Sequence, residues 1–381
     1  MLAAGAVAAR AATESIPPPR VTVDLAASVR VPGGQPKLAW PASGEAALLT
    51  PGGTALGSAQ AAKAVPIASV TKVMTAYLVL KDHPLATGSP GFNLTITAAE
   101  AAELPARRAQ DQSLVDVHAG QVLTERAALE ALLLPSADNI ADALASYDAG
   151  SITAFVARMN RQAAAFGMTH THFADASGLD PQTVSSATDL VLLGQKAMAV
   201  PAFASIVAMP SVTVPGLGLL KNYNTLVGTD GFDGVKTGST LAAGQALMFS
   251  VSRPVAGHPV RLLGAVLEQH GPGVAGGALQ AARALTDSYY KQLEVRTALP
   301  AGTAVAAVSR VGHRSTLTTL QPLRLVALPG ATVELAVTVH SPPGRRWATV
   351  RVGGYPAGAQ VSTDVWAVPG AGVGWRLNHL L

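Results

Sequence analysis

The stretch that decides the fold lies at residues 66–80 and reads PIASVTKVMTAYLVL. A proline leads into an apolar pattern with the spacing of a helix. The residues that would face a core are Val73, Ala76, Tyr77 and Leu80. Ser69 and Lys72 stand three positions apart on this helix, so the hydroxyl and the amine share a face and can meet. Free backbone N–H groups at a helix start suit a nucleophile whose product carries a transient oxyanion.

Composition limits the classes of protein that this chain can represent. The length of 381 residues is enough for two or three domains. The net charge of +4 comes without a dense Lys/Arg run with interleaved aromatics, which argues against nucleic-acid binding. The chain has no cysteine, which excludes disulfides, thiol catalysis and cysteine-metal sites. No run of about 18 strongly apolar residues occurs, so the sequence predicts no membrane-spanning helix.

Changes in character along the chain predict three segments. Residues 1–40 are interpreted as a leader, either the remnant of a secretory signal or a disordered Ala-rich start, followed by a Pro-rich extended linker over 13–40. Residues 41–293 alternate helical and strand patterns and form the predicted catalytic domain. Residues 294–381 consist of short strand patterns between Pro/Gly turns, which predicts a small all-β domain.

Local patterns predict the main elements of the two domains. In the catalytic domain, helices are expected at 98–104, 124–134, 136–144, 151–167, 189–198 and 277–290, and strands at 45–50, 55–59, 93–97, 113–117, 234–237, 246–251 and 262–267. In the last domain, strands are expected at 305–308, 323–327, 333–339, 348–352 and 361–366.

Two further motifs accompany Ser69 and Lys72. One is Leu134-Pro135-Ser136-Ala137-Asp138-Asn139, in which Ser136 could equally be a simple helix N-cap. The other is Lys236-Thr237-Gly238-Ser239, where small residues on a strand edge would let a substrate backbone approach. The alternative without a function is a strand next to a turn, with Lys236 exposed to solvent. Each motif is weak alone, and the order of the three carries the information.

The order Ser-x-x-Lys, Ser-x-(Asp/Asn), Lys-Thr-Gly resembles the serine D-alanyl-D-alanine carboxypeptidases, the low-molecular-mass penicillin-binding proteins of peptidase family S11. The resemblance covers roughly residues 40–293. Softer matches to the same family occur at Met159-Asn160, Gly167-Met168-Thr169, His172-Phe173, Ser177-Gly178-Leu179-Asp180 and Asn222-Tyr223-Asn224. It implies an α+β fold of the penicillin-binding and serine β-lactamase type, a helical cluster plus an antiparallel sheet, here followed by the small all-β domain.

The resemblance also implies the roles of the site residues. Ser69 would be the nucleophile, Lys72 its base with Lys236 as a nearby second cation, and Ser136 a proton relay. Backbone N–H groups of Ser69 and Ser239 would form the oxyanion hole. Lys236 and Thr237, followed by Gly238, would hold the substrate carboxylate, with Asp138 and Asn139 as further substrate-binding positions. No metal and no cofactor is implied.

The implied substrates are peptidoglycan stem peptides ending in D-Ala-D-Ala, with β-lactams as covalent inhibitors and no nucleic-acid partner. The implied location is extracytoplasmic, either secreted or associated with the outer face of the cytoplasmic membrane. The partner of the C-terminal domain is not indicated. Two alternatives stay open: a catalytically weakened binding module of the cell wall, and a β-lactamase. The β-lactamase interpretation lacks support, because no Glu-x-x-Leu-Asn stretch that would activate a deacylating water lies between the second and third motifs.

One position departs from the family pattern. Asp138 stands where the family usually has Asn, and Asn139 follows it. A carboxylate cannot donate a hydrogen bond to a substrate carbonyl, and beside Lys72 it would blunt the base. We therefore expect either that Lys236 holds Asp138 or that a shifted loop presents Asn139. Successive helix residues do not share a face, so Asn139 is not a free replacement.

Overall fold

The computed structural model describes residues 18–50, 53, 55–58, 60–310, 313–342, 345–352 and 360–367. The chain divides into two compact units. One unit spans Lys37–Lys291, and the other joins the residues before Lys37 to those from Gln292 onward. Each unit has its own hydrophobic core.

A five-stranded antiparallel sheet organises the Lys37–Lys291 unit. Its strands, in spatial order, are β11 (Phe232–Thr240), β12 (Gly244–Val255), β13 (His258–Gln269), β3 (Glu45–Leu49) and β4 (Ala55–Gly57). Ala256 and Gly257 alone connect β12 to β13, and both have positive φ, as the tight turn of a right-twisted hairpin requires. The pairing of β3 with β13 brings the start of the unit beside its end.

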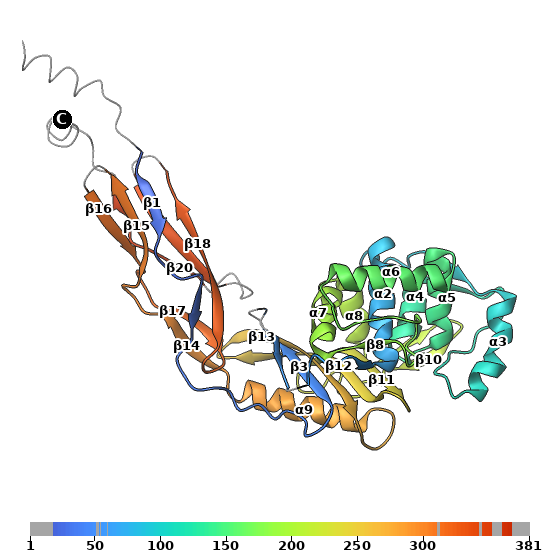
Figure 1. Ribbon diagram of the computed structural model, residues 1–381. Coiled ribbons are helices and arrows are strands. Elements are labelled where there is room, and N and C mark those ends of the chain that lie inside the picture. The colour runs from blue at the N-terminus through green and yellow to red at the C-terminus, as the bar shows by residue number, and fades with distance from the viewer. Residues whose placement is uncertain are drawn as a thin grey trace, which may run out of the picture. The chain divides into compact units, whose positions relative to one another are not determined.

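Helices cover both faces of this sheet (Figure 1). Helix α9 (Gly276–Tyr290) lies on one face, and the remaining helices gather over the other. These are α2 (Lys72–Asp82), α3 (Ala98–Ala109), α4 (Glu125–Leu133), α5 (Asp138–Ala149), α6 (Ile152–Ala165), α7 (Ala187–Met198) and α8 (Pro201–Val207), with a 3₁₀ turn η1 (Ala68–Thr71) before α2. Two-stranded ribbons complete the unit: β5 (Val65–Pro66) with β8 (Val184–Ser185), β6 (Asn93–Thr95) with β7 (Val122–Thr124), and β9 (Ser211–Val214) with β10 (Gly218–Lys221).

Helix α2 is more central than a single apolar stripe predicts. Of its eleven residues, Lys72–Ala76 and Leu78–Leu80 are all buried, whereas Tyr77 is only partly buried. A helix that is apolar nearly all round is one that neighbours surround. The consequence for the site is that the Lys72 side chain, at the start of α2, is 0% exposed.

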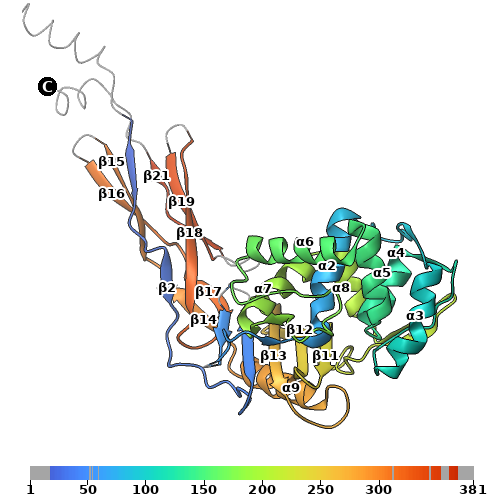
Figure 2. The ribbon, with the colours of Figure 1, turned by 45° about the vertical axis from the view of Figure 1, so that its right-hand side comes forward.

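The second unit contains only strands among its described residues. They are β1 (Arg20–Val23), β2 (Ser28–Arg30), β14 (Glu294–Leu299), β15 (Ala304–Arg310), β16 (His313–Thr318), β17 (Leu323–Ala327), β18 (Thr332–His340), β19 (Arg345–Val352), β20 (Gln360–Ser362) and β21 (Trp366–Ala367). They form sheets in the orders β1-β15-β16, β14-β17 and β2-β18-β19-β20, with β21 also on β19. Figure 2 shows β2 beside β18.

The predicted fold class is confirmed, a helical cluster with an antiparallel sheet followed by an all-β unit. Two local predictions are wrong. Within the supposed linker over 13–40, residues 20–23 and 28–30 are strands, because they pair with β15 and β18 about 300 positions later. Residues 113–117, predicted as a strand, have no regular structure, since their backbone bonds go to α5 residues instead.

Candidate active site

The Ser69 hydroxyl and the Lys72 amine meet as their spacing predicts. Ser69 lies in the η1 turn, and its Oγ accepts a hydrogen bond of 2.8 Å from Nζ of Lys72. Ala68, at the start of this turn, has a φ of +47°. A 2.8 Å hydrogen bond from the Thr71 hydroxyl to the Ala68 carbonyl stabilises the turn. A non-glycine residue with positive φ is a strained conformation of the kind that concentrates at functional sites.

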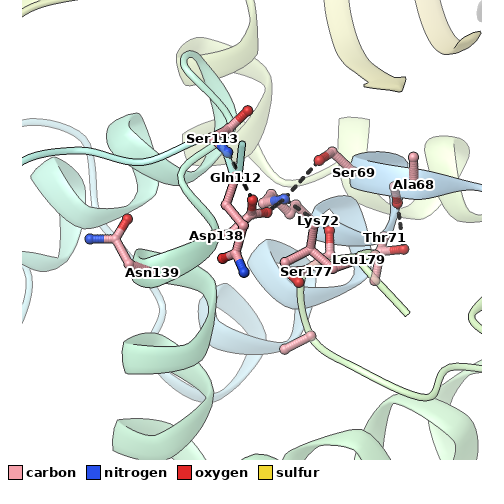
Figure 3. Close-up of polar contacts among 12 residues, drawn as sticks. Ala68, Ser69, Thr71, Lys72, Gln112, Ser113, Asp138, Asn139, Ser177 and Leu179 are labelled. Carbon is pink, nitrogen blue, oxygen red and sulfur yellow. Dashed lines mark hydrogen bonds and ion pairs between the residues drawn. The ribbon is translucent and has the colours of Figure 1, made fainter. Parts of the chain in front are cut away.

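Asp138 is the unexpected neighbour of this pair. Its Oδ1 lies 2.5 Å from Nζ of Lys72, and both side chains are at most 2% exposed. Neither sequence alternative holds: Lys72, rather than Lys236, pairs with Asp138, and Asn139 is not presented to the site. Asn139 instead donates to the carbonyl of Val115 at 3.0 Å, on the side of α5 that points away from Lys72 (Figure 3).

A loop after α6 supplies the third partner of Lys72. The carbonyl of Ser177 accepts a 2.8 Å bond from Nζ, so all three ammonium protons of Lys72 have acceptors. The carboxylate of Asp175 fixes this loop by accepting bonds from the Ser177 hydroxyl and from the N–H of Gly178, both at 2.8 Å. The hydroxyl of Thr75 on α2 donates to the carbonyl of Ala176 at 2.7 Å and ties the loop to the helix.

Strand β11 carries the third motif, Lys236 to Ser239, and passes close to the backbone of Ser69. Among the described residues it is the edge strand of its sheet and pairs with β12 alone. At the start of β11, the carbonyls of Phe232 and Gly234 accept bonds from the Gly228 N–H and the Asn224 amide. An edge strand can pair with an added backbone where its groups have no partner. A Cβ built on Gly238 would lie 3.1 Å from the backbone nitrogen of Ser69, which shows how closely β11 approaches the nucleophile. Ser239, the predicted oxyanion-hole partner, is the next residue and is exposed.

Lys236 on β11 belongs to the same charged cluster. Its side chain is 1% exposed, and its Nζ donates to the carbonyl of Thr237 at 2.9 Å. Burial lowers the pKa of Lys236 well below its usual value, the charge of Lys72 lowers it further, and Asp138 acts in the opposite direction. The charges of Lys72 and Asp138 therefore act on Lys236 within the site.

Ser136 lies just before α5 with a φ of +67° and is 2% exposed. Its Oγ has no hydrogen-bond partner among the described residues. An N-cap hydroxyl would bond to a helix N–H, and α5 begins without a side-chain cap bond. The simple N-cap interpretation is therefore wrong, and among the described residues the buried hydroxyl has no hydrogen-bond partner.

Sequence reasoning missed two contributors to the site. The Ser113 N–H donates to Oδ2 of Asp138 at 3.1 Å, and Ser177 acts through its carbonyl. The stretch from Ser177 to Asp180 resembles the family in sequence, but residue type does not show which backbone carbonyl will accept a bond. In the described part of the chain, no group of three or more His, Cys, Asp or Glu side chains is placed to hold a metal ion.

The arrangement defines a class: a serine hydrolase of the penicillin-binding fold, with a lysine-paired serine between a helical cluster and the edge of an antiparallel sheet. The sequence model of the D-alanyl-D-alanine carboxypeptidase family, peptidase S11, matches residues 43–270. The chain belongs to this family, and the resemblance drawn from its motifs is confirmed.

Individual relatives agree with this assignment. D-alanyl-D-alanine carboxypeptidase DacB2 of Mycobacterium tuberculosis is 34% identical over 214 residues, which is 54% of this chain and 69% of the relative. DacA of Escherichia coli is 31% identical over 52% of this chain, but the match spans only 49% of that protein. The Streptomyces K15 DD-transpeptidase structure has a TM-score of 0.57 and 26% identity, covering 67% of this chain and 98% of that one. Penicillin-binding protein D2 of Listeria monocytogenes, solved in its ampicillin-bound form, has a TM-score of 0.53 and 28% identity, covering 67% of this chain and 98% of its own.

No single helix within the described ranges combines the length and apolar character of a membrane span. Helices α7 and α8 pass such a test only as a pair bent by 109°, by length and composition.

Proposed function

We propose that this protein removes the terminal D-alanine from peptidoglycan stem peptides ending in D-Ala-D-Ala, through an acyl-enzyme on Ser69. The observation that carries this function is the 2.8 Å contact between Ser69 Oγ and the fully buried amine of Lys72, next to Gly238 on the edge strand β11. A serine hydroxyl is a weak nucleophile and needs a base within hydrogen-bond reach. Family membership and the carboxypeptidase relatives support the same reaction.

In the acylation step, Ser69 Oγ bonds to the carbonyl carbon of the penultimate D-alanine, and the bond to the nitrogen of the terminal D-alanine breaks. The Ser69 proton passes to the amine of Lys72 and, through the unpartnered hydroxyl of Ser136, reaches the leaving nitrogen. N–H groups of Ser69 and Ser239 would stabilise the oxyanion. Water then cleaves the ester and returns the proton to Ser69.

The terminal carboxylate of the substrate would bind at Lys236 and Thr237. The desolvated Lys236 has a pKa well below its usual value, so an arriving carboxylate would stabilise its charged form. This pairing would orient the scissile bond toward Ser69 on the neighbouring η1 turn. β-Lactams carry a carboxylate next to a strained amide, so they should acylate the same serine.

The test is intact mass after incubation with benzylpenicillin. We expect one adduct of the drug's mass on the wild-type protein and none on Ser69→Ala. Ser205→Ala is a matched control, because Ser205 is an exposed residue of α8 whose hydroxyl bonds only locally, to the carbonyl of Ala202 at 2.8 Å. The second assay is D-alanine release from a stem pentapeptide. A folded protein that forms no adduct at any pH and releases no D-alanine would contradict the proposed function.

We also propose that the protein acts outside the cytoplasmic membrane, where stem peptides are incorporated into the wall. The proposal follows from the substrate of the family, and the absence of cysteine is compatible with it. Labelling of Ser69 in intact cells by a fluorescent penicillin that does not cross the cytoplasmic membrane would support it. Labelling only after lysis would contradict it.

A further inference from the structure

Asp138 and Lys72 form an ion pair. The asparagine usual at this position is neutral and could form only a hydrogen bond with the lysine. Oδ1 of Asp138 takes one proton of the ammonium at 2.5 Å, and its Oδ2 accepts from the N–H of Ser113 at 3.1 Å. The backbone N–H of Asp138 also donates to the carbonyl of Ser113 at 2.7 Å, which fixes the residue at the start of α5. A carboxylate in the first turn of a helix is stabilised in its ionised form.

This geometry favours the ammonium form of Lys72 over the amine. The amine is the form that can accept the Ser69 proton. When the ammonium loses a proton, the carboxylate of Asp138, which is 2% exposed, loses the one cationic group that bonds to it among the described residues. A buried charge left without its partner is strongly unfavourable. Deprotonation of Lys72 is therefore opposed for as long as Asp138 is ionised.

The other charged groups near the pair do not relieve this opposition. Lys236 on β11 bonds through its Nζ to the Thr237 carbonyl rather than to Asp138, and burial and the charge of Lys72 both disfavour its charged form. Asp142, one turn along α5, is engaged by Arg107 at 2.8 Å. Asp175 in the neighbouring loop is occupied by bonds from its own loop, such as the 2.7 Å bond from the Leu179 N–H.

We propose that Asp138 is a positioning residue that holds Lys72 in its charged form at neutral pH, so that acylation of Ser69 requires one proton to leave the Lys72–Asp138 pair first. Above neutrality this proton goes to solvent, and the Ser69 proton then passes to the free amine. The inference rests on the proposed acylation of Ser69. It makes this chain a slow acylating enzyme at pH 7 whose reaction accelerates with pH.

The experiment measures the second-order rate constant for acylation by a fluorescent penicillin between pH 6 and pH 10. For the wild type we expect the rate constant to be still rising above pH 8. In Asp138→Asn, which keeps the shape and removes the charge, we expect about a tenfold faster reaction at pH 7 and a rising limb that begins at lower pH than in the wild type. Asp142→Asn removes a neighbouring, partly buried carboxylate that bonds to Arg107 and not to Lys72, and its profile should match the wild type.

A wild-type profile that is flat from pH 6 to pH 10 would overturn the inference, and this measurement does not depend on how any variant folds. A slower Asp138→Asn reaction with an unmoved limb, in protein with an unchanged melting temperature, would also overturn it and would make Asp138 a purely geometric support. In both outcomes Ser69 is still acylated, so the proposed function stands. If neither protein is acylated at any pH, both the function and the inference fail.

Discussion

Gly238 is the position at which a single methyl group tests the geometry of the site. The residue lies on β11 with its backbone outside the left-handed region, so alanine fits the local conformation. The added Cβ would lie 2.8 Å from the carbonyl oxygen of Ile67 and 3.1 Å from the backbone nitrogens of Ser69 and Val70. All three atoms are backbone, which cannot rotate out of the way as a flexible side chain can.

The expected effect follows from these distances. Ordinary contact begins near 3.4 Å, so β11 and the η1 turn must separate by about 0.6 Å at Ile67. Oxyanion-hole donors act only when they lie about 2.7–3.1 Å from the oxyanion, and losing one costs roughly 100-fold to 1,000-fold in rate, about 3–4 kcal/mol. We therefore expect Gly238→Ala to acylate about 100-fold more slowly. Overpacking at the edge of the sheet should destabilise the fold by only about 1 kcal/mol, because alanine also restricts the unfolded chain.

The assay is the acylation rate constant by stopped-flow or gel fluorescence, together with the melting temperature. Gly194→Ala is the control, since the new Cβ meets only the flexible end of Met248 at 3.1 Å and alanine favours the α7 helix. Acylation of Gly238→Ala within threefold of the wild type, at unchanged stability, would refute the close approach of β11 to Ser69 as a determinant of rate.

Two further predictions concern stability. Burial raises the pKa of Glu45 to about 7, although the bond that its carboxylate accepts from the Ala187 N–H acts in the opposite direction. Between pH 4.5 and pH 7 the folded state therefore keeps a proton on Glu45 that the unfolded state releases. The free energy of unfolding should fall by roughly 3 kcal/mol over this pH range. Urea unfolding should show this slope in the wild type and lose it in Glu45→Gln, and a flat wild-type profile would contradict the assignment. Gly178→Ala should destabilise by about 3 kcal/mol or more, because Gly178 has a φ of +89° and a Cβ there would lie 1.8 Å from the carbonyl oxygen of Ala68. A melting temperature equal to the wild type would show that the loop yields freely at this contact.

Most helices and strands of the catalytic unit follow from local pattern. The helices at 124–134 and 151–167 have Thr124 and Ser151 as N-caps, and both hydroxyls accept the expected backbone bonds. The buried strands β12 and β13 lie where continuous apolar runs place them. Local pattern could not find β1 and β2, because a three- or four-residue strand is stabilised by partners about 300 positions away rather than by its own sequence.

The sequence by itself determined the chemistry: Ser69 and Lys72 share a helical face by their spacing, and the order of the three motifs assigns the family. Only the tertiary structure decided which groups surround the Lys72 amine. Asp138 could have paired with either lysine, and the docking of α5 against α2 selects Lys72. The Ser177 carbonyl and the Ser113 N–H act through backbone atoms, which every residue possesses. Their positions depend on how distant segments pack, and residue identity does not encode that directly.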